Sequence, residues 1–253
     1  MSLPPYAIAV LIDNTDISID GDFYPNRLDA QKTTVDRLSQ FYFSSNPKSQ
    51  IGIVTMGSKE FGLRTSLTSS HTTILKTLQN IKPGGSLYFL KALKTIMIML
   101  KYCNTDVEEK RVLAFIGGDH GINDKEKANE IATTFTREDI PLDIVIIGKR
   151  VPNVPLIKNM CRQIPGSNCI EIRECDNLLS DKVFSSKICP AKNLSQAELN
   201  ELIENEPAFS VIRQSMAHSA QKKDPSKSGS SNSSPSKYKP QMLKKMIPHI
   251  KNH

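Results

Sequence analysis

The chain has 253 residues, which is enough for one substantial α/β domain with an appendage. Its formal net charge of +7 is unevenly placed, because residues 221–253 contain eight lysines and one aspartate, whereas residues 1–220 contain 25 basic and 25 acidic side chains. The excess charge therefore belongs to a tail, and it does not indicate a nucleic-acid-binding groove on a folded domain.

The composition also argues against a membrane or secreted protein. Pro4, Pro5 and several acidic side chains near the N-terminus do not fit a signal peptide, and the longest apolar stretch, residues 87–100, is interrupted by Lys91 and Lys94. None of the five cysteines forms a Cys-x-x-Cys pair, which favours reduced thiols over a zinc site or disulfides. We expect a soluble intracellular protein.

The first element in chain order is a strand over residues 7–12. This run is apolar throughout, as in a parallel-sheet strand that is covered on both faces, and it ends at Asp13-Asn14-Thr15. A polar loop follows, and then a long helix that Asp22 is expected to cap and whose first turn suits Pro25.

The rest of the first 190 residues alternates between apolar runs and amphipathic segments. Strands are expected at residues 50–56, 61–66, 111–116, 142–147 and 168–172, and helices at residues 72–78, 86–102, 128–135, 154–164 and 176–187. Residues 86–102 are apolar on all sides, which predicts a deeply packed helix. This alternation predicts an α/β fold with a doubly wound, mostly parallel sheet flanked by helices, and with ligands at the carboxyl ends of its strands.

The pattern changes after this domain, which we place at residues 1–190. Residues 194–220 open with a capping box and predict a helical segment. Residues 221–253 are rich in lysine and serine and offer little to bury, which predicts a disordered basic tail. Such a tail suits solubility, nuclear import, weak phosphate binding or anchoring to an acidic surface.

Three kinds of chemical site compete at the strand ends. A magnesium site of the Asp-x-Ser-x-Ser type lacks its third oxygen ligand, because Ile17 stands in that place, and Gly118 stands where a further aspartate is needed. A calcium loop starting at Asp16 fails because Arg27 occupies its twelfth position. An acid/base pair at Asp119-His120 is a third reading, although no catalytic motif accompanies it. We expect no metal, no cofactor and no enzymatic activity.

What remains is a fold that serves as a docking surface. Asp13 and Asp16 lie at a strand end with no metal to neutralise them, so they are candidates to meet a lysine or arginine of a partner. The alternative is that both carboxylates cap and hydrogen-bond within their own loop.

Several segments together carry a family resemblance. Asp13-Asn14-Thr15, residues 21–31 (Gly-Asp-Phe-Tyr-Pro-Asn-Arg-Leu-Asp-Ala-Gln), Ser45-Asn46-Pro47 and residues 142–148 resemble the von Willebrand A domain of the proteasome regulatory particle's ubiquitin-receptor subunits. The resemblance covers roughly residues 6–190, and the missing metal ligands fit it. The lysine-rich end is not part of the family pattern.

The predicted C-terminal helix occupies the place of that family's ubiquitin-interacting motif. Its stripe resembles the motif, with an acidic cluster upstream and Ser215 at the central serine, and its residues are Ala208, Val211, Ile212, Ser215 and Met216. Val211 departs from the expected alanine, and Ala217-His218 replace the usual acidic end. The alternative is an amphipathic helix that packs on its own domain.

The resemblance implies a non-catalytic proteasome subunit in the cytoplasm and nucleus. Its A domain would dock between lid and base subunits, and its C-terminal helix would bind polyubiquitin weakly, gaining strength from several ubiquitins on one chain. The alternative is a von Willebrand A scaffold in another intracellular complex, such as a transcription or repair factor, without ubiquitin binding.

Overall fold

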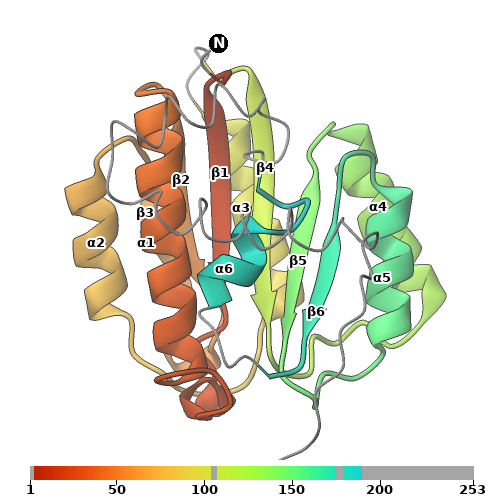
Figure 1. Cartoon of the computed structure of the whole chain (residues 1–253). Helices are drawn as coiled ribbons and strands as arrows, with labels where there is room; N and C mark the ends of the chain where they lie inside the picture. The colour runs from red at the N-terminus through yellow and green to blue at the C-terminus, as the bar shows by residue number, and fades with distance from the viewer. Residues whose placement is uncertain (1–2, 104–106, 175–178, 190–253) are drawn as a thin grey trace, which may run out of the picture.

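A computed structural model describes residues 3–103, 107–174 and 179–189 of the chain. These residues form one six-stranded sheet in the order β3-β2-β1-β4-β5-β6 (Figure 1). Its strands are β1 Tyr6–Ile12, β2 Gln50–Thr55, β3 Gly62–Thr68, β4 Glu109–Ile116, β5 Leu142–Ile147 and β6 Cys169–Ile172. Only β3 runs antiparallel within this sheet, so the predicted doubly wound, mostly parallel α/β fold is confirmed.

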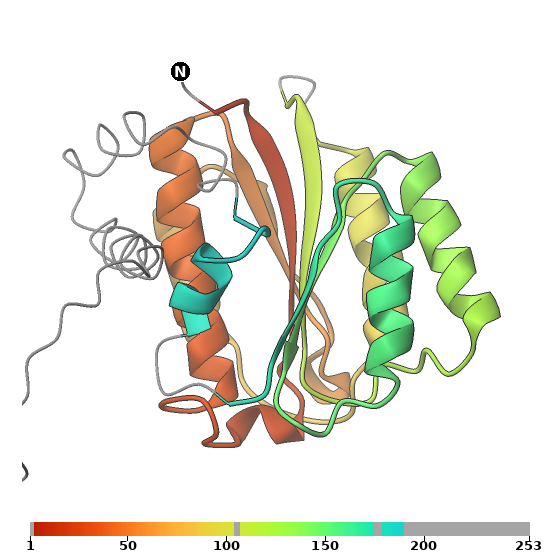
Figure 2. The ribbon, with the colours of Figure 1, turned by 45° about the vertical axis from the view of Figure 1, so that its right-hand side comes forward.

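Helices cover both faces of the sheet, as Figure 2 shows. They are α1 Arg27–Ser45, α2 His71–Asn80, α3 Phe89–Lys101, α4 Lys125–Arg137, α5 Val154–Gln163 and α6 Leu179–Phe184, with short 3₁₀ turns η1 Asp16–Ile19 and η2 Ser58–Glu60. One core lies between the sheet and α1, α2 and α6, and a second lies between the sheet and α3, α4 and α5. Alternate residues of β1 supply the two cores, because successive side chains of a strand point to opposite faces.

The central strand β1 pairs in parallel with β2 on one side and β4 on the other. The chain first adds β2 and β3 on one side of β1 and then crosses to add β4, β5 and β6 on the other side. The strand order therefore reverses between β1 and β4, and at such a point the loops after two neighbouring strands diverge and leave a binding crevice. This topology brings the residues after β1 and β4 together.

Two local expectations were wrong. Asn26 caps α1 by accepting a hydrogen bond from the backbone N–H of Asp29 at 2.8 Å, so Asp22 and Pro25 precede the helix. The helix α3 is buried along one face only, and its Ile98 side chain is 62% exposed. A helix with apolar residues on all sides can still pack against the sheet on one side only. Whether anything covers its other side depends on the whole fold and not on the helix sequence.

The closing helix was expected at residues 176–187, and its described part, α6, ends at Phe184, before the expected end. Its side chains Leu179, Val183 and Phe184 are buried against α1. The predicted helical segment 194–220 and the predicted disordered tail 221–253 lie outside the described residues.

Candidate functional site

Asp13 lies directly after β1 and is buried, with 2% of its surface exposed. Its Oδ1 accepts hydrogen bonds from the backbone N–H of Thr15 at 3.0 Å and from the Thr15 hydroxyl at 2.6 Å. Its Oδ2 accepts from the backbone N–H of Gly117, after β4, at 2.7 Å. Burial raises the pKa of this carboxyl, while these hydrogen bonds and the charge of Arg27 oppose the rise.

Neighbouring side chains fix the backbone around Asp13. The Gln31 side chain from α1 accepts from the Asp13 N–H and donates to the Asp13 carbonyl, both at 2.9 Å. Asn14 accepts from the N–H of Gly57 at 2.6 Å and donates to the carbonyl of Lys82 at 2.9 Å. The loops after β1 and β2 and the loop before α3 are thereby tied into one unit.

A buried cation, Arg27, lies at the same edge of the sheet. This first residue of α1 donates to both carboxylate oxygens of Asp22 at 2.7 Å, and its Nη1 donates to the Gly117 carbonyl at 3.3 Å. Asp20 lies 3.5 Å from its Nη2. Hydrogen bonding to Asp22 raises the pKa of Arg27 despite its burial. The guanidinium therefore places a positive charge near the carboxylates of Asp22, Asp20 and Asp13.

These residues do not fit a metal ion of the Asp-x-Ser-x-Ser type. Both carboxylate oxygens of Asp13 and the Thr15 hydroxyl are already engaged in hydrogen bonds within the chain. Ile17 lies against Gly118, where a β-carbon would come within 3.0 Å of the Ile17 side chain. In the described residues no group of three or more histidine, cysteine or carboxylate side chains is placed to hold a metal.

Asp16, in contrast, faces solvent. Its side chain is 68% exposed, accepts from the backbone N–H of Gly85 at 2.9 Å and lies 3.8 Å from the ammonium of Lys59. Two large apolar side chains that follow Asp16 are also exposed, Ile19 of the same 3₁₀ turn at 63% and Tyr24 of the next loop at 80%. We call Asp16, Ile19, Tyr24 and Lys59 the edge surface. Of the two aspartates predicted for docking, Asp16 belongs to this surface, and Asp13 lies beneath it.

The proposed acid/base pair does not form a reactive site. His120 is 1% exposed; its Nε2 donates to the Pro152 carbonyl at 2.8 Å, and its Nδ1 accepts from the Ile122 N–H at 3.1 Å. Burial lowers the pKa of His120, which favours this neutral form. The Asp119 carboxylate instead accepts from the Gly121 N–H at 3.0 Å. Both ring nitrogens are therefore used to hold the loop after β4.

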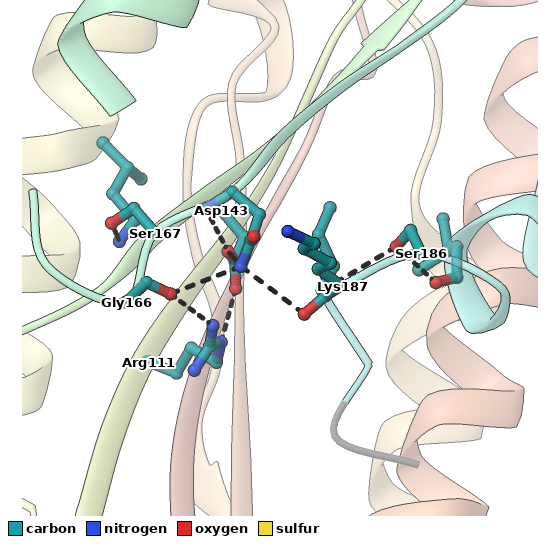
Figure 3. Close-up of polar contacts among 10 residues, drawn as sticks. Arg111, Asp143, Gly166, Ser167, Ser186 and Lys187 are labelled. Carbon is teal, nitrogen blue, oxygen red and sulfur yellow. Dashed lines mark hydrogen bonds and ion pairs between the residues drawn. The ribbon is translucent and has the colours of Figure 1, made fainter. Parts of the chain in front are cut away.

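A second buried charge cluster, drawn in Figure 3, lies near the amino ends of β4 and β5. Arg111 of β4 pairs with Asp143 of β5, which is fully buried and also accepts from the N–H of Asn168 at 2.8 Å. Asn168 contacts the carbonyl of Lys187 at 3.4 Å, so the cluster links β4, β5 and the residues after α6. The role of this cluster is structural, because it connects the last described residues of the domain to the sheet.

Sequence reasoning missed Arg27 and the pair Arg111–Asp143. A buried aspartate within the apolar run of β5 was the available signal for the second, and the aspartates at 20 and 22 before Arg27 were the signal for the first. The residues predicted to bind ubiquitin, Ala208, Val211, Ile212, Ser215 and Met216, lie outside the described residues. Among the described helices, none is long and apolar enough to cross a membrane.

Comparison with known proteins shows which domain family this chain resembles. A family model described as the von Willebrand factor type A domain matches residues 8–120. The 26S proteasome regulatory subunit rpn10 of Schizosaccharomyces pombe is 26% identical over 184 residues, which cover 72% of this chain and 75% of that protein. The 26S proteasome non-ATPase regulatory subunit 4 of Dictyostelium discoideum is 25% identical over 185 residues, which cover 72% of this chain. This chain spans about half of that relative's length, since the match covers 53% of it.

Solved structures agree on the fold. The crystal structure of the SpRpn10 VWA domain matches with a TM-score of 0.65 at 23% identity, covering 73% of this chain and 96% of that one. Proximal thread matrix protein 1 from the mussel byssus, whose structure is described as having a zinc-occupied MIDAS motif, matches with a TM-score of 0.58 at 15% identity, covering 73% and 45%. The same fold thus occurs with an occupied metal motif in that protein, and here with Arg27 beside Asp13.

Proposed function

We propose that this chain, which carries a von Willebrand factor type A domain homologous to that of the proteasome subunits rpn10 and non-ATPase regulatory subunit 4, is a non-catalytic subunit of the proteasome regulatory particle. Its A domain docks between lid and base subunits through the edge surface. Its C-terminal segment contributes a weak polyubiquitin contact. The protein works in the cytoplasm and nucleus, as such a subunit must.

One observation at the carboxyl edge supports docking over chemistry. The polar groups beneath the surface (Asp13, Thr15, Gln31 and His120) are engaged within the chain, while Ile19 and Tyr24, which follow Asp16 in the chain, are exposed, as are Asp16 and Lys59. Adjacent exposed apolar side chains with charges at their rim are typical of protein–protein contacts. The role of Asp13 is then to hold the loop that presents Asp16.

Association with the proteasome tests the docking proposal. We expect full-length chains carrying Asp16→Lys or Tyr24→Ser to co-purify with regulatory particles several-fold less than the unchanged chain, because one reverses an exposed charge and the other removes an exposed ring. Glu108→Lys is the matched control, since Glu108 is exposed at the opposite edge of the sheet. If co-purification fell equally in all three variants, or in none of them, the edge surface would not be the docking site.

The C-terminal segment is tested separately. Removal of residues 194–253 is expected to spare incorporation into the proteasome, because the proposed contact lies in the domain. In an NMR titration of isotopically labelled ubiquitin with the full-length chain, we expect shifts in ubiquitin's apolar patch that disappear with Ile212→Asp and Ser215→Asp. No shifts at millimolar chain concentration would leave the protein as a structural clamp.

The second candidate is a von Willebrand A scaffold of another intracellular complex. It rests on the fold alone, because this fold serves proteins of unrelated function. Stable association of the full-length chain with a complex that contains no proteasome subunit would favour it.

A further inference from the structure

A groove of about 650 Å³ lies between α3 and α4, and none of the edge-surface residues lines it. Both helices cover the same face of the sheet (Figure 2). The floor of the groove is apolar and comes from both helices and the turn before β5; it includes Leu93, Met97, Ile131, Phe135 and Ile140. We call it the α3–α4 groove.

Apolar residues of α3 that are not fully buried, Met97 and Ile98, line this groove. Met97 is half-buried and Ile98 is exposed, although both are apolar. Across the groove, Ile131 of α4 is also only half-buried. An apolar depression between two helices suits an amphipathic helix that inserts its apolar stripe.

The rim of the groove is positively charged. Five cationic side chains line it against two acidic ones, Glu130 and Glu138; the cations are Lys94, Lys101, Lys110, Lys127 and Arg137. Arg137 pairs with Glu138, but the four lysines form no ion pair with any residue that the structure describes. The occupant should therefore be acidic as well as apolar on one side.

This chain contains a segment of that chemistry just beyond the domain. Residues 195–206 contain four glutamates and no lysine or arginine. They start with the capping box Ser195-Gln196-Ala197-Glu198, and Leu199, Leu202 and Ile203 follow at helical spacing. The segment is predicted to form an acidic helix with one apolar stripe.

The chain leaves the described domain close enough to reach the groove. Ile188 lines a small internal cavity together with Arg111 of β4, and the preceding residue, Lys110, lines the groove on the other face of the sheet. From Cys189 to Ser195 an extended chain can span about 20 Å. Packed layers are separated by roughly 10 Å, so the segment can pass the sheet edge and enter at the Lys101–Lys110 end.

We propose that the α3–α4 groove is the docking site of the acidic segment 195–206 of the same chain, with Leu199, Leu202 and Ile203 on its apolar floor and the glutamates against its lysine rim. This contact would fix where the following residues, 208–216, emerge from the domain. The proposal does not depend on the proteasome assignment, because the isolated full-length chain tests it.

Zero-length carbodiimide cross-linking of the monomeric full-length chain gives the first test. We expect mass spectrometry to find cross-links from Glu198, Glu201 or Glu204 to Lys94, Lys101 or Lys127, at least several-fold above those to the exposed control lysines Lys48, Lys76 and Lys82. The double substitution Leu199→Asp/Leu202→Asp should remove this preference. Equal cross-linking to groove and control lysines would overturn the proposal.

A charge-reversal pair gives the second test without altering the floor. Hydrogen exchange should show protection of residues 195–206 in the unchanged chain and in Lys48→Glu/Lys76→Glu/Lys82→Glu. Protection should be lost in Lys94→Glu/Lys101→Glu/Lys127→Glu, while exchange in the buried strands β1 and β4 stays unchanged. Protection that depends on chain concentration would instead assign the groove to a second copy, and unprotected exchange in the unchanged chain would refute docking.

Discussion

Arg27 is the residue on which the carboxyl edge of the sheet depends. Its guanidinium is buried, pairs with both oxygens of Asp22 and donates to the Gly117 carbonyl, so it joins the loop before α1 to the end of β4. A buried ion that loses its partner is costly, whereas the same loss at a surface costs little. Two arginines of α1 allow that difference to be measured.

We expect Arg27→Met to lower the free energy of unfolding by about 3 kcal/mol, at the low end for a broken buried pair because Asp22 reaches solvent. Arg37→Met is the matched control, since Arg37 lies on the same helix and pairs with Asp181 near the surface. It should cost about 1 kcal/mol or less. Urea unfolding of the two variants measures both values, and equal losses would contradict a special role for Arg27.

The buried carboxyl of Asp13 should make the stability of the domain depend on pH. Burial raises the pKa of Asp13 in the folded state above its unfolded value, so the folded state binds the proton more tightly. The associated stability is fully present below the unfolded pKa, near 3.8, and is lost as pH rises through the raised folded pKa. Asp13→Asn cannot ionise and should not show this loss.

Asp13→Asn should also lower the free energy of unfolding by an amount that does not depend on pH. The reason is that the NH₂ of the new amide would face the Gly117 N–H, which now donates to Oδ2 of Asp13. We therefore expect Asp13→Asn to be less stable than the unchanged chain at pH 4, with a deficit that narrows toward pH 7. The narrowing should amount to about 1.4 kcal/mol for each unit by which burial has raised the pKa. A deficit that widens with pH would mean that Arg27 and the hydrogen bonds outweigh burial.

At this scale the sequence located the right loops but not all their contacts. Asp13-Asn14-Thr15 could be placed at a strand end because the preceding apolar run is unmistakable. The burial of Asp13 and its bond to Gly117 could not be read, since 104 residues separate the partners and only the sheet order brings them together. The role of Arg27 was hidden for the same reason, because its acceptor Gly117 follows another strand, 90 residues further along the chain.

At the scale of elements, β2 joins its neighbours through two glycines with different surroundings. A β-carbon at Gly57, just after β2, would lie 2.5 Å from the Gly84 carbonyl and 2.7 Å from that of Asn14, both backbone atoms. A β-carbon at Gly52 would instead meet the sulfur and methyl of Met99 on α3, at 2.5 and 2.8 Å. Backbone cannot yield without breaking hydrogen bonds, whereas the end of a methionine can turn away.

We expect Gly57→Ala to destabilise the domain by about 3 kcal/mol, the upper end for overpacking, and Gly52→Ala by less than about 1 kcal/mol. The backbone angle φ of Gly57 is −67°, which alanine adopts freely, so the loss at this position is steric alone. Thermal unfolding should separate the variants by several degrees. A larger loss for Gly52→Ala would mean that Met99 cannot move.

Most elements were predictable because each buries one apolar pattern of the right period. The expected strands at residues 50–56, 111–116 and 142–147 and the helix at 154–164 agree closely with β2, β4, β5 and α5. The helix α3 is an exception, because a helix that is apolar on all sides has no periodic pattern to show which face is buried. Its apolar residues on all sides predicted full burial, but the structure leaves Met97 and Ile98 at the α3–α4 groove.

At the scale of the whole molecule, alternation of strands and helices was sufficient to predict a doubly wound sheet. A parallel pair needs a crossover connection, and helices supply it. Where the domain closes was harder to predict, because α6 is short and its contribution comes from tertiary contacts. Phe184 packs edge-on against Phe41 of α1 with ring centroids 6.0 Å apart, and Asn168 holds the Lys187 carbonyl at 3.4 Å.

These contacts predict a sharp boundary for independent folding. Residues 179–189 bury five side chains in the core beside α1, namely Leu179, Val183, Phe184, Ile188 and Cys189. At about 2 kcal/mol each, their burial is worth on the order of 10 kcal/mol, comparable with the total stability of a domain.

A chain ending at residue 189 should therefore unfold cooperatively within a few degrees of the full-length protein, since the core is complete. A chain ending at residue 178 should lose cooperative unfolding in calorimetry and expose its apolar core to a hydrophobic dye. If the shorter chain still unfolded cooperatively, the sheet and α1 would form a stable core without α6, and the domain would have to be redrawn to end before it.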